Sequence, residues 1–202
     1  MPCGMQVNQT INPIAFAYLR NPLPYNAYDK RPPTTTTQVT VTMQFGFSIP
    51  GVILLAMLFV PNIAWGRRQP EGYAEVSRNE SRVLLALERA GQVATTCAAV
   101  IFVCPRGFSM PWLLWLVAAF ALMLLYEAAW ARYFKGGGRL IDMYAPLGPI
   151  PIPLASLPVA AFALLGIWCQ SPITLVAAAV LGVGHIGIHL GHLRELSAPS
   201  GR

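Results

Sequence analysis

The feature that constrains this chain most is a series of long apolar stretches separated by short polar segments. They cover residues 45–65, 83–104, 111–134, 152–168 and 173–193. Each holds roughly 17–24 residues, and about 20 apolar residues in a helix cross a bilayer core about 30 Å thick. Only 11% of the residues are charged, whereas an ordinary soluble domain has about 25%. We therefore predict an all-α fold, a polytopic membrane helical bundle of about five transmembrane helices.

The chain divides into three parts by composition. Residues 1–44 are polar and rich in proline and threonine, a composition typical of a disordered tail. Met43 stands directly before the first apolar stretch and leaves open whether residues 1–42 belong to the translated protein. We predict a transmembrane domain over residues 45–196 and a cytoplasmic tail over residues 197–202.

The basic residues predict how the bundle lies in the membrane. Four of them follow the first apolar stretch and two follow the third: Arg67, Arg68, Arg78, Arg82, Lys135 and Arg139. The loop after the second stretch has only Arg106, and the turn after the fourth has no charge. Because basic loops stay in the cytoplasm, we predict that the N-terminus is outside and the C-terminus inside. The basic residues of the N-terminal tail conflict with this prediction, because it places them outside the cell.

Ionisable side chains within the apolar stretches predict a polar pocket. One such group at the centre of a membrane helix costs roughly 2.5–3.5 kcal/mol. Two glutamates and two histidines lie at a similar depth, roughly 6–12 Å from the cytoplasmic ends of their helices at a rise of about 1.5 Å per residue. We expect three or four helices to direct them into one pocket in the cytoplasmic leaflet. The candidate substrate- or ion-binding residues are Glu88, Gln92, Glu127, His185, His189 and Asn62.

Three functional interpretations of this pocket stay open, beside a structural one. His185 and His189, four residues apart, could hold a divalent metal together with a carboxylate. The acids and imidazoles could instead relay protons or coordinate a transported ion. Arg89 and Arg132, as charge partners, could meet the phosphate of a lipid headgroup. The structural alternative is that Glu88 pairs with Arg132 or with a polar group of a neighbouring helix and only fixes the packing.

Two further patterns concern the packing of the bundle. Gly184, Gly187 and Gly191 form a stripe of small residues that allows another helix to approach closely. Cys104 and Cys169 fall at the predicted outer ends of their helices, where an oxidising compartment favours a disulfide.

Three segments carry a family resemblance. Residues 79–92, 126–134 and 182–189 resemble small uncharacterised bacterial polytopic membrane proteins. The resemblance implies a bacterial cytoplasmic membrane and no particular activity.

The functional interpretation from the sequence is a membrane protein that handles an ion or small solute. The alternatives are a membrane-embedded enzyme acting on a lipid or isoprenoid headgroup, and a structural or regulatory partner of another membrane protein. The net charge of +6 does not indicate nucleic acid, because the basic residues lie in short loops and not along one face. The predicted partners are the lipid bilayer and a small solute, ion or lipid.

Overall fold

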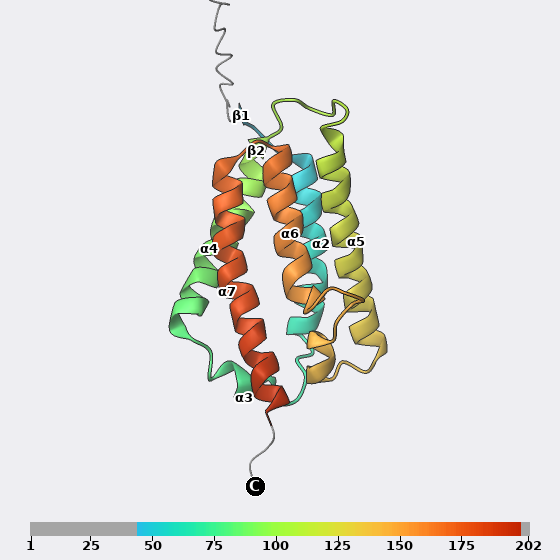
Figure 1. The fold of residues 1–202 in the computed structure, drawn as a ribbon, viewed down its shortest axis with the longest axis vertical. Coiled ribbons are helices and arrows are strands. Elements are labelled where there is room, and N and C mark those ends of the chain that lie inside the picture. The colour runs from blue at the N-terminus through green and yellow to red at the C-terminus, as the bar shows by residue number, and fades with distance from the viewer. Residues whose placement is uncertain (1–43, 199–202) are drawn as a thin grey trace, which may run out of the picture. The chain divides into compact units, whose positions relative to one another are not determined.

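The computed structural model describes residues 44–198, which form a bundle of helices with a small sheet at one end (Figure 1). The elements are β1 (Gln44–Phe45), α2 (Ile49–Gly66), α3 (Tyr73–Ser77), α4 (Arg82–Ile101), β2 (Phe102–Val103), α5 (Leu113–Lys135), the 3-10 helix η1 (Leu140–Tyr144), α6 (Pro153–Trp168) and α7 (Pro172–Ser197). The predicted disordered tail lies outside the described residues except for Gln44, which belongs to β1. Residues 199–202 of the predicted C-terminal tail also lie outside them.

Four of these helices, α2, α4, α5 and α7, are long and apolar enough to cross a membrane. Their apolar windows are mostly exposed: only 22% of the window is buried in α2 and in α4. Large apolar side chains such as Val60, Val93, Val117 and Val183 project outward from them. Contiguous apolar surface of this extent suits lipid and not water. The all-α class and the presence of several helices able to span a membrane are therefore confirmed.

Helix α6 is the inner helix of the bundle. It packs against α5 on one side and α7 on the other, and Ala155, Ala161, Phe162 and Leu165 have no exposed surface. Its 16 residues give a length of about 24 Å at 1.5 Å per residue. It matches the fourth predicted stretch but is shorter than the four candidate spans.

The first helix begins later than the sequence predicts. Phe45, the first residue of the predicted stretch, pairs antiparallel with Phe102 of β2 instead of starting the helix. Helix α2 begins at Ile49 because the Ser48 hydroxyl accepts a hydrogen bond of 3.3 Å from the Gly51 N–H, as an N-cap serine does. The short elements α3 and η1 were not predicted, since each has only five residues, too few for a periodic pattern.

The predicted disulfide between Cys104 and Cys169 is wrong. Both cysteines are buried near the sheet, and both are free thiols. The Cys169 thiol is directed at backbone instead, with its Sγ donating to the Phe102 carbonyl at 3.5 Å.

Helices α4 and α7 run antiparallel and pack most extensively of all pairs. The contact has no space for side chains at two points. A Cβ added to Gly91 of α4 would overlap the backbone of Leu181, and one added to Gly184 of α7 would overlap the backbone of Glu88. Small residues allow membrane helices to approach this closely. The predicted glycine stripe is thus half correct, because Gly184 meets α4 whereas Gly191 has open space around it.

Replacing Gly184 by alanine tests this contact. A Cβ at this position lies 2.7 Å from the Leu84 carbonyl oxygen, so α7 must move away from α4 and the protein loses stability. We expect Gly184→Ala to lower the unfolding temperature of the protein in lipid nanodiscs. Gly191→Ala is the matched control on the same helix, and it should leave the temperature unchanged or raise it slightly, since alanine favours helix by about 1 kcal/mol over glycine. Equal effects of the two variants would contradict the close contact.

Candidate functional site

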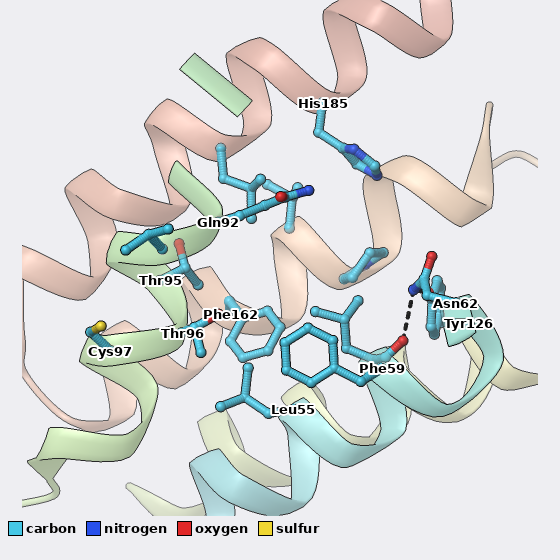
Figure 2. Close-up of a pocket in the computed structure, with 15 residues that line it drawn as sticks. Leu55, Phe59, Asn62, Gln92, Thr95, Thr96, Cys97, Tyr126, Phe162 and His185 are labelled. Atoms are coloured by element: carbon cyan, nitrogen blue, oxygen red, sulfur yellow. Dashed lines mark hydrogen bonds between the residues drawn. The ribbon is translucent and has the colours of Figure 1, made fainter. Parts of the chain in front are cut away.

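A cavity of about 470 Å³ lies within the bundle, beside the contact of α4 with α7. Residues of α2, α4, α5, α6 and α7 all contribute to its wall. Phe59 of α2 forms one side, Thr96 of α4 forms the opposite side, and Phe162 of α6 lies between them (Figure 2). Leu58 of α2 and Val93 of α4 also line the cavity. Phe59 and Val93 are also exposed on the outside of the bundle, so the cavity opens sideways between α2 and α4. Its volume falls in the range of small-molecule sites, about 300–1,000 Å³.

A few polar side chains face this apolar cavity from different helices. The Asn62 amide of α2 donates a hydrogen bond of 2.6 Å to the hydroxyl of Tyr126 on α5. Gln92 of α4 and His185 of α7 point toward the same space (Figure 2). Asn62 also donates to the Leu58 carbonyl of its own helix at 2.7 Å. Convergent polar groups in an apolar wall are the arrangement by which small-molecule sites orient a ligand.

The Glu88 carboxylate holds His185 in place. Its Oε1 atom lies 2.6 Å from His185 Nδ1, and both side chains are largely buried, with 13% and 22% of their surface exposed. The pair exists because Gly184, next to His185, lies directly on the backbone of Glu88. With Nδ1 engaged by the carboxylate, Nε2 is the ring nitrogen of His185 available to the cavity. A carboxylate on one nitrogen orients an imidazole for proton transfer at the other.

The three histidines of the chain are all on α7 and form a row. The ring centroids of His185 and His189 lie 4.5 Å apart, and those of His189 and His192 lie 6.2 Å apart. His189 Nδ1 is buried without a hydrogen-bond partner among residues 44–198. The row therefore leads from the cavity toward the C-terminal end of α7.

The far end of the row is anchored by residues outside the candidate spans. The Tyr144 hydroxyl of η1 lies 2.9 Å from His192 Nδ1, and its ring lies 5.6 Å from that of His189. Burial raises the pKa of Tyr144. In the His192 tautomer that carries its proton on Nε2, the Tyr144 hydroxyl donates to Nδ1. Nε2 of His192 lies 3.2 Å from Oε1 of Glu80. This last contact is an ion-pair distance without hydrogen-bond alignment.

The other predicted site residues lie elsewhere. Glu127 is half-buried on α5 and makes no hydrogen bond or ion pair with any described residue. Arg132 donates to the carbonyls of Ala145 and Pro146, at 2.6 and 2.7 Å. It therefore holds the loop after η1 and does not pair with Glu88. Arg89 is exposed on α4.

The geometry does not favour the metal interpretation. Among residues 44–198, no three His, Cys, Asp or Glu side chains converge closely enough to hold a metal ion. One nitrogen of His185 is already taken by Glu88.

Sequence reasoning missed four residues of the site. Tyr126 is next to the predicted Glu127, and only the helical phase decides which of the two faces inward. His192 lies seven residues after His185, which places it on the same helix face, and this spacing could have included it. Glu80 follows from the antiparallel register, which pairs position 80 with 192 as it pairs 88 with 184. Nothing in the sequence indicates that Tyr144 reaches this row.

A double-mutant cycle measures the Glu88–His185 contact. Removing one partner leaves the other buried without its hydrogen bond, whereas removing both does not. We expect Glu88→Leu and His185→Leu to be non-additive, with a coupling of about 1.5–3 kcal/mol, typical of hydrogen bonds to charged groups, in the free energy of unfolding. Asp142→Asn is the control, because Asp142 pairs with Arg139 at the surface and its loss should change little. Additive effects at positions 88 and 185 would contradict the contact.

Comparison with known proteins finds no relative of this chain. No protein-family model, no curated protein and no solved structure matches the chain. Its function is therefore argued from its own residues.

Proposed function

We propose that this chain is a multi-pass membrane protein that takes up a small amphipathic molecule from the bilayer into the cavity between α2 and α4. The observation that carries the proposal is the combination of an apolar cavity with the polar groups of Asn62, Gln92, Tyr126 and His185. An apolar wall binds the body of such a molecule by the hydrophobic effect and dispersion. The polar groups bind its head.

The sideways opening favours a solute dissolved in lipid. Phe59 and Val93 line the cavity and are exposed on the outer faces of two helices that are apolar enough to span a membrane. A molecule in the hydrocarbon layer therefore reaches the cavity between α2 and α4 without crossing water. A bare ion would be bound poorly here, because most of the wall is apolar and an ion would lose its hydration without compensation.

We further propose five spans, with α6 as the fifth, in a bacterial cytoplasmic membrane. Helix α6 is short, but it is surrounded by α5 and α7 and has no charged residue. Arg67 and Arg68 follow the C-terminal end of α2, Lys135 is the last residue of α5, and Arg139 follows it. Basic residues remain on the cytoplasmic side, so this end faces inward and the sheet faces outward.

Photoreactive probes test the binding function. A medium-chain alcohol carrying a diazirine is compared with the alkane of matched length, each added to the full chain in phosphatidylcholine nanodiscs. We expect both probes to label peptides of α2 and α4 that line the cavity, and the alcohol to label them more strongly. Gln92→Leu should lower labelling by the alcohol about fivefold, because one hydrogen bond contributes about 1 kcal/mol and 1.4 kcal/mol is a factor of ten. Labelling by the alkane should not fall.

Two variants of matched size complete this test. Thr96→Phe places a ring in the cavity and should reduce labelling by both probes. Val117→Phe adds similar bulk on the outer face of α5, where Val117 is 54% exposed, and should change neither. Unchanged labelling in Thr96→Phe would show that the probes bind elsewhere and would overturn the proposal.

A further inference from the structure

Acidic, imidazole and phenol side chains connect the cavity to the end of the bundle near α3. The row begins at the Glu88–His185 pair in the cavity wall and ends at Glu80, in the loop before α4. Charged and titratable groups inside a membrane protein are costly and are kept where they serve function, including proton relays. Here each end of the row has a carboxylate.

The row consists of direct polar contacts at its two ends and of ring contacts around His189 in the middle. Hydrogen-bond or ion-pair distances occur at three places: 2.6 Å from Glu88 to His185, 2.9 Å from Tyr144 to His192 and 3.2 Å from His192 to Glu80. His189 lies between the inner and outer contacts, with its ring 4.5 Å from that of His185 and 5.6 Å from that of Tyr144. Its Nδ1 has no partner within the described part of the chain. An imidazole with a free nitrogen accepts a proton on one side and releases another on the other side.

We propose that this row is a proton relay, through which the Glu88–His185 pair exchanges protons with the aqueous phase at the α3 end of the bundle. The inference rests on the proposed function, since it makes binding in the cavity proton-linked. Release toward the α3 end starts when the inner pair gives a proton to His189. His189 passes one to the Tyr144 oxygen as the Tyr144 hydroxyl proton moves to His192 Nδ1. The Nε2 proton of His192 then moves to Glu80 and to water.

The proton count of this sequence balances. Only N–H and O–H bonds form and break, the inner pair loses one proton and the water beyond Glu80 gains one. The reverse sequence carries a proton from the water beyond Glu80 to the Glu88–His185 pair.

The groups that face the row from neighbouring elements are few. Helix α4 contributes Glu88, α3 contributes Tyr73, whose ring lies 6.0 Å from that of His192, and η1 contributes Tyr144. Arg89 of α4 is exposed, and its charge acts on Tyr73. Tyr133 of α5 lies near Tyr144. Helices α2 and α6 carry no ionisable side chain. Within the described residues, the route from the cavity toward the α3 end is therefore the histidine row itself.

The experiment follows protonation of Glu88 after a light-triggered pH jump. The full chain in nanodiscs is monitored by time-resolved infrared absorption of the carboxyl group, and the signal is assigned by its loss in Glu88→Gln. We expect His189→Phe, which keeps a ring of similar shape, to slow the rise of this signal at least tenfold. Glu80→Gln, a change in a loop, should also slow it and serves if His189→Phe does not fold. Glu71→Gln, which changes an exposed glutamate in the loop before α3, should not.

The outcomes separate this inference from the binding function. A wild-type rate in His189→Phe, or in Glu80→Gln if only that variant folds, means that protons reach Glu88 through the cavity, and it overturns the relay. The infrared signal is measured without any probe. Slowed protonation combined with absent probe labelling would therefore keep the relay and reject the binding proposal, and the opposite pair of results would do the reverse.

Discussion

The backbone contact between α4 and α7 is the constraint on which the site depends. Two antiparallel helices can bring an acid on one beside an imidazole on the other only if their axes approach closely. Gly91 and Gly184 provide that approach, because a side chain at either position would overlap the facing backbone. The same register that sets Gly184 on Glu88 places His185 at Glu88 and His192 at Glu80. One packing contact thus positions both ends of the histidine row.

The cavity depends on how α2 packs against the α4–α7 pair. Helix α2 meets α4 near the sheet, where Gly51 lies on the carbonyl of Ala99. Further along, Leu58 and Phe59 of α2 line the cavity. Lipid-facing helices need not close every lateral gap, since the surrounding solvent is itself apolar. The Glu88–His185 pair lies at the inner wall of this gap. The gap can therefore hold the apolar part of a ligand, while the polar pair forms hydrogen bonds with its head.

Much of the fold could be predicted from the sequence because lipid imposes length and hydropathy on every span. The predicted stretch 83–104 became α4 at Arg82–Ile101, and 152–168 became α6 at Pro153–Trp168. The site was less predictable. The depth of a residue along its helix follows from the number of residues to the helix end. This count correctly predicted that Glu88, His185 and His189 lie close together. Which face of a helix points inward depends on how the helix packs against its neighbours. The packing of α5 directs Tyr126 toward the cavity and leaves Glu127 outside it. Contacts to loops, such as those of Tyr144 and Arg132, have no periodic signal.

The most direct test of this account is the state of His185 in lipid. Because the chain has three histidines, the ring nitrogens of the protein labelled with ¹⁵N-histidine give few NMR signals, and each can be assigned by a single substitution. The account predicts that Glu88→Gln shifts the His185 Nδ1 signal strongly, since its carboxylate partner is lost. Identical His185 signals in the wild type and in Glu88→Gln would contradict it.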